Sequence, residues 1–494
     1  MSTADNALAK KTSKEQQAFE ERFNDAGALE EGSEERKRLE KKLVRKLDLR
    51  FSIFIVIYIL NYIDRNNVSA ARTKGLVEDL GLKGREYDTL LSILYVSYIL
   101  AQIPSNMIVQ YTGRPSIWLP SCCIVWGLIS TLTGITHNFT GALLCRFFLG
   151  FVEAAFFPGA LMVLASWYKK NELGLRFTLL YCGSLLSNAF GPLIAAGILG
   201  NMEGKLGHPA WRWLFYIEGA LTMFVAVIAV PILPDFPHNS RGFTAEELEL
   251  AQLRMTEDVG AKDDTTIGPW TAFKLAVGDY KLWLVAVTFA SLTIGLSFNQ
   301  FFPQLTRTLG YSNTASLLLC APPFFFAAIC AFITSRHSDK VQERYLHIVC
   351  AAVMGIVGFG IAMGTHSFGP RYFSLFLMAG SYAGFVCYLA WISSSFARPA
   401  PTRAIAIAFI NAFSQLGNVA GAYIFPANWG PSYKNSYAIC IGTFGFAIIG
   451  CTVHRFNLAR LNRKLAERDE NEANGVEVEG FPLEKFPRGF RYVL

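Results

Sequence analysis

Residues 51–72 read FSIFIVIYILNYIDRNNVSAAR, a mostly apolar stretch that carries Asp64 and Arg65 in its second half and ends at Arg72. A helix that crosses the hydrocarbon core of a membrane needs about 20 mostly apolar residues, and this stretch has that length. An ionisable side chain inside such a helix costs about 2.5–3.5 kcal/mol on insertion scales. The stretch therefore predicts a crossing helix and marks Asp64 and Arg65 as functional candidates.

The composition of the whole chain agrees with this prediction. The 494 residues are 52% hydrophobic and only 17% charged, against about 25% charged in soluble domains. The net charge of +7 could suggest a nucleic-acid partner, but the basic residues lie in tails and loops, where membrane topology explains them better. We therefore expect a membrane protein that binds no nucleic acid.

Similar apolar segments recur along the chain and are separated mostly by short connectors. Six segments precede a polar stretch and six follow it, which predicts an all-α membrane protein of twelve transmembrane helices in two six-helix halves. The expected starts are near Phe51, Thr89, Ser116, Gly141, Arg176, Trp211, Lys281, Asn313, Leu346, Tyr372, Arg403 and Tyr437. The expected units are a tail (1–46), a first half (47–234), a central loop (235–280), a second half (281–455) and a second tail (456–494).

The charges of the tails predict the orientation. Eight Lys or Arg residues lie between Arg36 and Arg50, and four more follow the last span between Arg455 and Lys464. The positive-inside rule places both tails in the cytoplasm. Leu39, Leu43 and Leu47 recur every four residues just before the first span, which suits either a helix on an anionic leaflet or a solvated helix.

The chain lacks the usual signatures of an enzyme or a metal protein. Its ten cysteines lie inside apolar stretches without C-x-x-C spacing, so we expect neither disulfides nor a metal site. Neither H-E-x-x-H nor G-x-S-x-G occurs. We expect a protein that is not an enzyme and needs no cofactor.

Charged residues inside the expected spans are few and lie in the first half. At about 1.5 Å per residue, Asp64 and Arg146 would lie at a similar depth, with Glu153 two helical turns further on the face of Arg146. The three predict a proton relay, although static ion pairs between two helices would use the same residues. For Glu218, with Arg212 nearby, we favour a structural role.

The spans of the second half carry polar but uncharged residues. Asn299 and Gln300 lie in the seventh span, and Asn411, Gln415 and Asn418 share one helix face in the eleventh. Such residues either bind substrate or form hydrogen bonds between helices. Aromatic residues near the expected pocket, including Trp391, could stack on a substrate ring or serve in packing.

Several motifs together resemble the major facilitator superfamily. Arg146-Phe-Phe-Leu-Gly150 resembles its fourth span, and the segments from Asn106 to Pro115 and from Ser335 to Arg344 resemble its repeated loop motif. Asp64-Arg65-Asn66-Asn67 and the stretch from Arg146 to Gly159 are similar to the anion:cation symporters, particularly the fungal allantoate/nicotinate permease branch. The resemblance covers residues 47–455.

The resemblance implies roles for residues at matching positions. Asp64 and Glu153 would take up protons, and Arg65 would hold a substrate carboxylate. The pocket would include Tyr98, Asn418 and the hydroxyls around Ser394. Gly183 and Ser184 stand where the family has a pocket glutamine, which implies a different substrate.

The loop motifs imply a gate at the cytoplasmic face. Arg114 belongs to the first copy, in which Gln110 replaces the usual acid. Asp339, Lys340 and Arg344 belong to the second copy, which keeps the acid. The resemblance therefore implies a weaker charge pair at the gate of the first half.

Together, these features predict a monomeric multi-pass transporter in a fungal plasma membrane. It would take up a small organic anion with protons by alternating access, the anion being a nicotinate-, allantoate-, vitamin- or sugar-acid-like carboxylate. The alternative is proton-driven export of a small metabolite, since Gly191-Pro192 partly matches the span 5 motif of antiporters. A nutrient receptor without transport would need a signalling feature in the tails, which the sequence does not offer.

Overall fold

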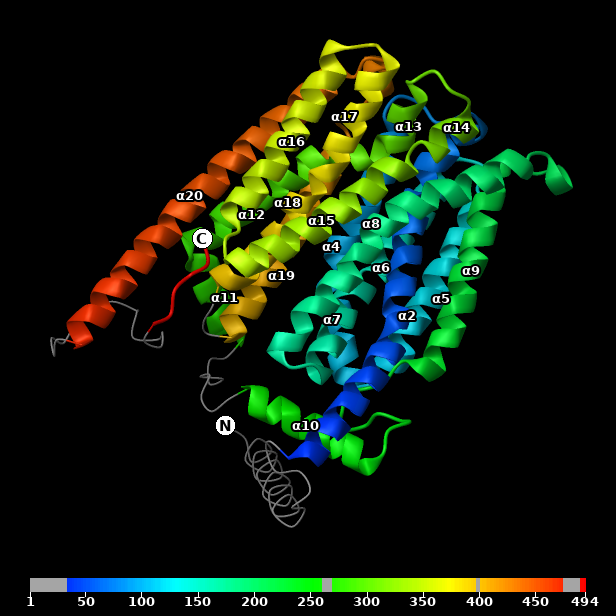
Figure 1. Cartoon of the computed structure of the whole chain (residues 1–494). Helices are drawn as coiled ribbons and strands as arrows, with labels where there is room; N and C mark the ends of the chain where they lie inside the picture. The colour runs from blue at the N-terminus through cyan, green and yellow to red at the C-terminus, as the bar shows by residue number, and fades with distance from the viewer. Residues whose placement is uncertain (1–32, 260–268, 397–399, 474–488) are drawn as a thin grey trace.

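The computed structural model describes residues 33–259, 269–396, 400–473 and 489–494, and these residues form a helical bundle (Figure 1). The elements of the first half are α2 (Glu34–Arg72), α3 (Leu76–Asp79), α4 (Glu86–Thr112), α5 (Pro115–Thr133), α6 (Phe139–Glu153), α7 (Phe156–Trp167), α8 (Lys170–Asn201), η2 (Lys205–Gly207) and α9 (Ala210–Ile232). Next come α10 (Ala245–Val259) and α11 (Pro269–Gly278). The second half comprises α12 (Tyr280–Gly295), η3 (Leu296–Phe301), α13 (Phe302–Arg307), α14 (Asn313–Leu318), α15 (Ala321–Val341), α16 (Tyr345–Gly364), α17 (Phe368–Gly380), α18 (Tyr382–Ser395), α19 (Ala400–Gly421), η4 (Ala427–Trp429) and α20 (Lys434–Ala473).

The expected all-helical membrane fold is confirmed. Within the described ranges, ten helical segments are long and apolar enough to cross a membrane. The other two expected spans are α2, whose crossing part carries Asp64 and Arg65, and α19, whose apolar part Ile405–Gly421 is shorter. The charged and polar residues that make these two helices less apolar are among the residues that the sequence marks as candidates.

The bundle has two ends, which we name by their elements. The α10 face is the end where α10 and the start of α2 lie, and the distal face is the end that carries α14 (Figure 1). The two halves pack against each other through α8 with α14 and α15, and through α4 with α19. At the distal face, Asn313 donates to the Thr73 carbonyl (2.8 Å), and the Tyr423 hydroxyl lies 3.1 Å from that of Thr89. These contacts hold the halves together at the distal face.

The basic segment before the first span is not a separate surface helix. It is the start of α2, which runs unbroken from Glu34 to Arg72. Leu43 and Leu47 are fully buried, in the same apolar cluster as Leu250 and Ala251 of α10. Neither expected environment, a lipid leaflet or water, therefore surrounds these leucines, because α10 covers them.

Several spans are interrupted near the middle of the bundle. The fourth span changes from α6 to α7 directly after Glu153, and the seventh passes from α12 into the 3₁₀ turn η3, which contains Asn299 and Gln300. Discontinuous helices are typical of substrate and ion sites in secondary transporters, and short 3₁₀ stretches within a helix often mark functional positions. The breaks therefore fall on residues that the sequence selects for function.

Candidate functional site

The centre of the first half is a buried ion pair between α2 and α6. Arg65 donates from Nε to Glu153 Oε2 at 2.7 Å, and the two side chains are 10% and 0% exposed. The Arg65 guanidinium also lies over the rings of Tyr98 and Tyr62, with its carbon 4.7 Å and 5.2 Å from their centroids. In the part of the chain that is described, Glu153 Oε1 has no hydrogen-bond partner. The pair thus leaves one carboxylate oxygen available.

Arg146 lies beside this pair but does not bind either acid. Its two terminal nitrogens each lie 3.4 Å from the backbone carbonyl oxygen of Arg65, and the residue is 2% exposed. Asp64 instead accepts hydrogen bonds from Ser130 and Thr222, at 3.1 Å each. Successive residues on a helix point about 100° apart, so Asp64 faces α5 and α9 while Arg65 faces α6. The pairing of Asp64 with Arg146 that equal depth suggests is therefore not formed.

A small cavity lies next to both arginines. Its lining contains two guanidinium groups, those of Arg65 and Arg146, and no carboxylate; the complete lining is Arg65, Asn66, Ser69, Leu91, Leu94, Tyr95, Arg146 and Gln300. We call it the arginine cavity. Guanidinium groups bind carboxylates through paired, charge-assisted hydrogen bonds, so this cavity is suited to a small organic anion.

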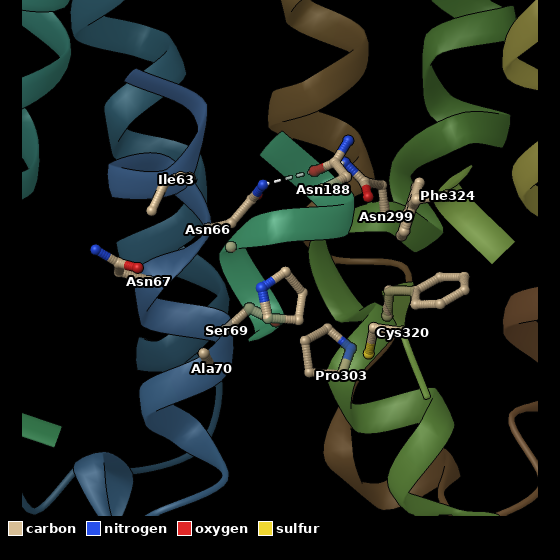
Figure 2. A pocket seen from close by; sticks show the side chains of 13 residues that line it. Ile63, Asn66, Asn67, Ser69, Ala70, Asn188, Asn299, Pro303, Cys320 and Phe324 are labelled. Carbon is tan, nitrogen blue, oxygen red and sulfur yellow. Dashed lines mark hydrogen bonds between the residues drawn. The ribbon is translucent and has the colours of Figure 1, made fainter. Parts of the chain in front are cut away.

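A second small cavity adjoins the first and shares Asn66 and Ser69 with it. We call it the asparagine cavity, because Asn188 Oδ1 accepts from Asn66 Nδ2 at 2.7 Å and from Asn299 Nδ2 at 3.4 Å (Figure 2). Asn66 and Asn188 belong to the first half and Asn299 to the second. Phe302, Pro303 and Phe324 add apolar surface. This cavity suits a neutral, partly ring-like portion of a ligand.

Of the predicted pocket residues, Asn299 lines the asparagine cavity, whereas Tyr98 contacts the Arg65 guanidinium but lines neither cavity. Asn418, in α19, donates to Gln415 Oε1 at 2.8 Å, and Ser184 donates to the carbonyl of Tyr181 in its own helix at 2.8 Å. Neither lines either cavity. Both therefore contribute mainly to helix structure in this conformation.

Trp391 and Ser394 lie away from both cavities. The Trp391 indole donates to the Val493 carbonyl at 3.0 Å, and Ser394 donates to the Trp391 carbonyl at 3.0 Å. The segment 489–494 reaches this region, since the Leu494 carbonyl accepts from the Arg344 amide at 2.6 Å. Neither residue lines a cavity in this conformation, and Trp391 is covered by a segment distant in the sequence.

The predicted gate residues differ between the two copies of the loop motif. Arg344 Nη2 pairs with Asp339 Oδ1 at 2.5 Å and Nη1 bonds Ser338 at 2.9 Å. Lys340 is exposed, and so is Arg114 in the first copy. No ion pair of Arg114 occurs among the residues with described positions. A charge pair therefore exists in the second copy, where the acid is kept.

Several residues of the site were given no role by the sequence. Asn188 and Tyr95 line the cavities, and Ser130 and Thr222 bind Asp64. An asparagine within an apolar helix is a usable signal for Asn188, whereas serine and threonine are too common in such helices to be informative. Over the described ranges, no group of three or more His, Cys, Asp or Glu side chains is placed to hold a metal ion.

Comparisons with known proteins agree with this geometry. Residues 54–422 match the family model described as Major Facilitator Superfamily. The chain is 33% identical over 433 residues to the MFS-type transporter cnsO of Penicillium expansum, covering 84% of this chain and 83% of that protein. It is 30% identical over 430 residues to the major facilitator-type transporter hxnP of Emericella nidulans, covering 84% of each.

Solved structures show the same fold at low sequence identity. A bacterial homologue of the human lysosomal transporter Spinster, in an inward-facing and unoccupied conformation, matches with a TM-score of 0.61 at 18% identity, covering 83% of this chain and 95% of that one. The xylose transporter XylE of E. coli, in a partially occluded inward-open conformation, matches with a TM-score of 0.59 at 16% identity, covering 81% of this chain and 96% of that one.

Proposed function

The chain belongs to the major facilitator superfamily and is a multi-pass secondary transporter, and from this premise we propose that it takes up a small organic anion together with protons. We assign it to the anion:cation symporters, in the fungal allantoate/nicotinate permease-like branch. The motifs at residues 64–67 and 146–159 and the fungal sources of its relatives support this assignment. We further propose that the protein resides in a fungal plasma membrane, and the basic residues between Arg36 and Arg50 support a cytoplasmic α10 face.

The observation that carries the proposal is the lining of the arginine cavity. Two buried guanidinium groups face it without a carboxylate in the lining. Among the described residues, the hydrogen bonds of Arg146 are long contacts to a backbone carbonyl, so a neutral substrate would leave its charge poorly compensated. A carboxylate would compensate that charge, because buried charges need opposite charges or hydrogen bonds.

Coupling to protons follows from the ion pair of Arg65 and Glu153. While Glu153 is ionised, it neutralises Arg65 and competes with the substrate for the guanidinium. When a proton binds Glu153, Arg65 is released to hold the substrate carboxylate. Binding of the proton and of the anion therefore favour each other, and this reciprocity is required of any two linked binding equilibria.

The asparagine cavity supports a substrate with two parts. Its amides and rings lie next to the arginine cavity, so the carboxylate would bind Arg65 and Arg146 while a neutral, ring-like or amide-bearing part would contact Asn66 and Asn299. Nicotinate-, allantoate-, vitamin- and sugar-acid-like compounds share this division between an anionic and a neutral part.

Transport by alternating access requires the distal contacts to open. The hydrogen bond from Asn313 to the Thr73 carbonyl joins the two halves at that end, and this contact supports substrate exchange at the α10 face in this conformation. Rocking of the halves would break this bond and expose Arg65 to the other side.

Uptake of labelled carboxylates into proteoliposomes with an imposed inward proton gradient tests the proposal. We expect at least one monocarboxylate to accumulate above its equilibrium level and to be released by a protonophore. Gly191 and Pro192 line the asparagine cavity, so the antiporter-like motif faces the site, and gradient-dependent exclusion of the compound would instead favour export. If no carboxylate responds to the gradient, the proposal is wrong.

A further inference from the structure

A third acidic residue of the first half, Glu218 in α9, lies in an unusual environment. It is 2% exposed, and neither of its carboxyl oxygens has a hydrogen-bond partner in the described part of the chain. The expected partner, Arg212, instead donates to the Gly134 carbonyl at 2.7 Å and lies over the Trp211 ring at 4.7 Å. Glu218 therefore has no ion pair with Arg212, and the structural role favoured from the sequence lacks its partner.

The polar groups near Glu218 come from α2, and α5 packs against the residue that follows it. From α2, Asp64 and Asn67 lie near it, and the amide nitrogen of Asn67 also has no hydrogen-bond partner among the described residues. Figure 2 shows Asn67 pointing away from the side of α2 on which Asn66 meets Asn188. Gly127 of α5 packs tightly against Gly219 of α9. A Cβ on Gly219 would lie 2.6 Å from the carbonyl oxygen of Gly127. Asp64 is thus the acidic neighbour, in a closely packed interface.

The two neighbouring carboxyl groups receive very different support. Asp64 accepts hydrogen bonds from two hydroxyls, one of them on Thr222, which lies one helical turn beyond Glu218 on α9. Hydrogen bonds to a carboxylate stabilise its charge, whereas a buried carboxylate without donors is costly. Two adjacent carboxylates also repel each other. The arrangement therefore favours one negative charge, on Asp64, with Glu218 as the neutral acid.

We propose that Asp64 and Glu218 form a second proton-binding site, in which Glu218 carries the proton while Asp64 is ionised. The site lies between α2 and α9, on a different side of α2 from the ion pair of Arg65 and Glu153. A proton that moves from Glu218 to Asp64 leaves one neutral acid and one carboxylate, so the charge of the pair is unchanged. A role of this site in transport rests on the proposed function, whereas the presence of a proton on Glu218 does not.

Infrared difference spectroscopy of the purified full-length protein in lipid vesicles at neutral pH tests this directly. The C=O stretch of a protonated carboxylic acid is distinct from the bands of a carboxylate. We expect Glu218→Gln to remove one protonated-acid signal and no carboxylate signal. Glu203→Gln, at an exposed glutamate whose carboxylate accepts from the Ala210 amide, is the matched control and should remove carboxylate signal only.

A second variant keeps the test decisive if Glu218→Gln does not fold. Thr222→Val removes one donor to Asp64 and leaves both acids in place, so we expect the protonated-acid band to shift as the proton redistributes to Asp64. Loss of only carboxylate signal in Glu218→Gln, or an unchanged acid band in Thr222→Val, would overturn the second site. Because the spectra need no substrate, such a result leaves the proposed uptake intact. Absence of uptake with the expected spectra would overturn the transport proposal alone.

Discussion

The two halves bring different chemistry to the two cavities. The charged side chains in the linings, Arg65 and Arg146, come from the first half, whereas the second half contributes amides, such as Asn299 and Gln300, and apolar rings. Recognition of charge and coupling to protons can therefore both reside in the first half. The other half can then adapt to the neutral part of the substrate without disturbing the ion pair.

The largest expected effect comes from removing the central charge of the first half. Arg65→Gln deletes the proposed carboxylate contact and leaves Glu153 buried without its partner. Breaking a buried charge pair costs about 2–5 kcal/mol, so we expect initial uptake rates to fall by about 100-fold or more. The exposed Arg460 provides a matched control, and Arg460→Gln should transport normally. Uptake by Arg65→Gln near the wild-type rate would contradict the proposal that the first half recognises the charge of the substrate through Arg65.

Glu153→Gln should separate coupling from binding. The glutamine mimics the protonated acid and leaves Arg65 available, so we expect exchange of labelled for unlabelled substrate across the vesicle membrane to persist. Accumulation driven by a pH gradient should fall by about tenfold or more, the change that 1.4 kcal/mol of lost coupling produces. A variant that still concentrates substrate normally would show that Glu153 is not the coupling acid.

The asparagine cavity offers a sharper comparison between the halves. Asn188→Ala removes the oxygen that accepts from both Asn66 and Asn299, whereas Asn299→Ala removes only the longer contact. With about 1 kcal/mol for a typical hydrogen bond, we expect KM to rise by about fivefold to tenfold for Asn188→Ala and by about twofold for Asn299→Ala. Asn201→Ala, at a residue bonded only within its own helix, is the control. Equal effects of the two variants would contradict the ranking.

The smallest expected effect lies outside the membrane, where α10 attaches to α2. The Lys46 ammonium donates to Glu247 at 2.7 Å, and although burial opposes it, this bond holds the pKa of Glu247 below its usual value of 4.5. Because the pKa is lowered in the folded state, the stabilisation is present above about pH 4.5 and is lost as the pH falls through the folded-state pKa.

The variant Glu247→Gln measures this contribution. We expect it to lower the free energy of unfolding by about 1 kcal/mol or less at pH 7, and the difference from the wild type should disappear at strongly acidic pH. Thermal unfolding in detergent at a series of pH values is the measurement. A difference that grows as the pH falls would have the wrong sign for this ion pair.

Much of the fold and part of the site could be predicted from the sequence. Apolar length and spacing are local properties, so most spanning helices begin close to the expected residues, whereas α2 begins at Glu34, well before Phe51. Asp64, Arg65 and Glu153 stand out because charge is rare in crossing helices. These signals depend on composition along one helix and need no knowledge of its neighbours.

The partners of those residues could not be predicted in the same way. Depth along a helix does not fix the direction of a side chain, so Asp64 was expected beside Arg146 although it faces Thr222. Trp391 was expected at the substrate but binds the carbonyl of Val493, a contact over 102 positions of the chain. Rotation about the helix axis and long-range packing decided these cases, and neither is encoded in a local pattern.

The continuity of α2 has a mechanical consequence. Its 39 residues contain neither proline nor glycine, so the helix is a rod of about 58 Å without a built-in hinge. One end is tied to α10 through Lys46 and Glu247, and at the other the Thr73 carbonyl is bonded to Asn313 of the opposite half. A tilt of α2 at its contact with α10 would therefore be transmitted along the helix. It would move the Thr73 carbonyl relative to Asn313 at the distal face.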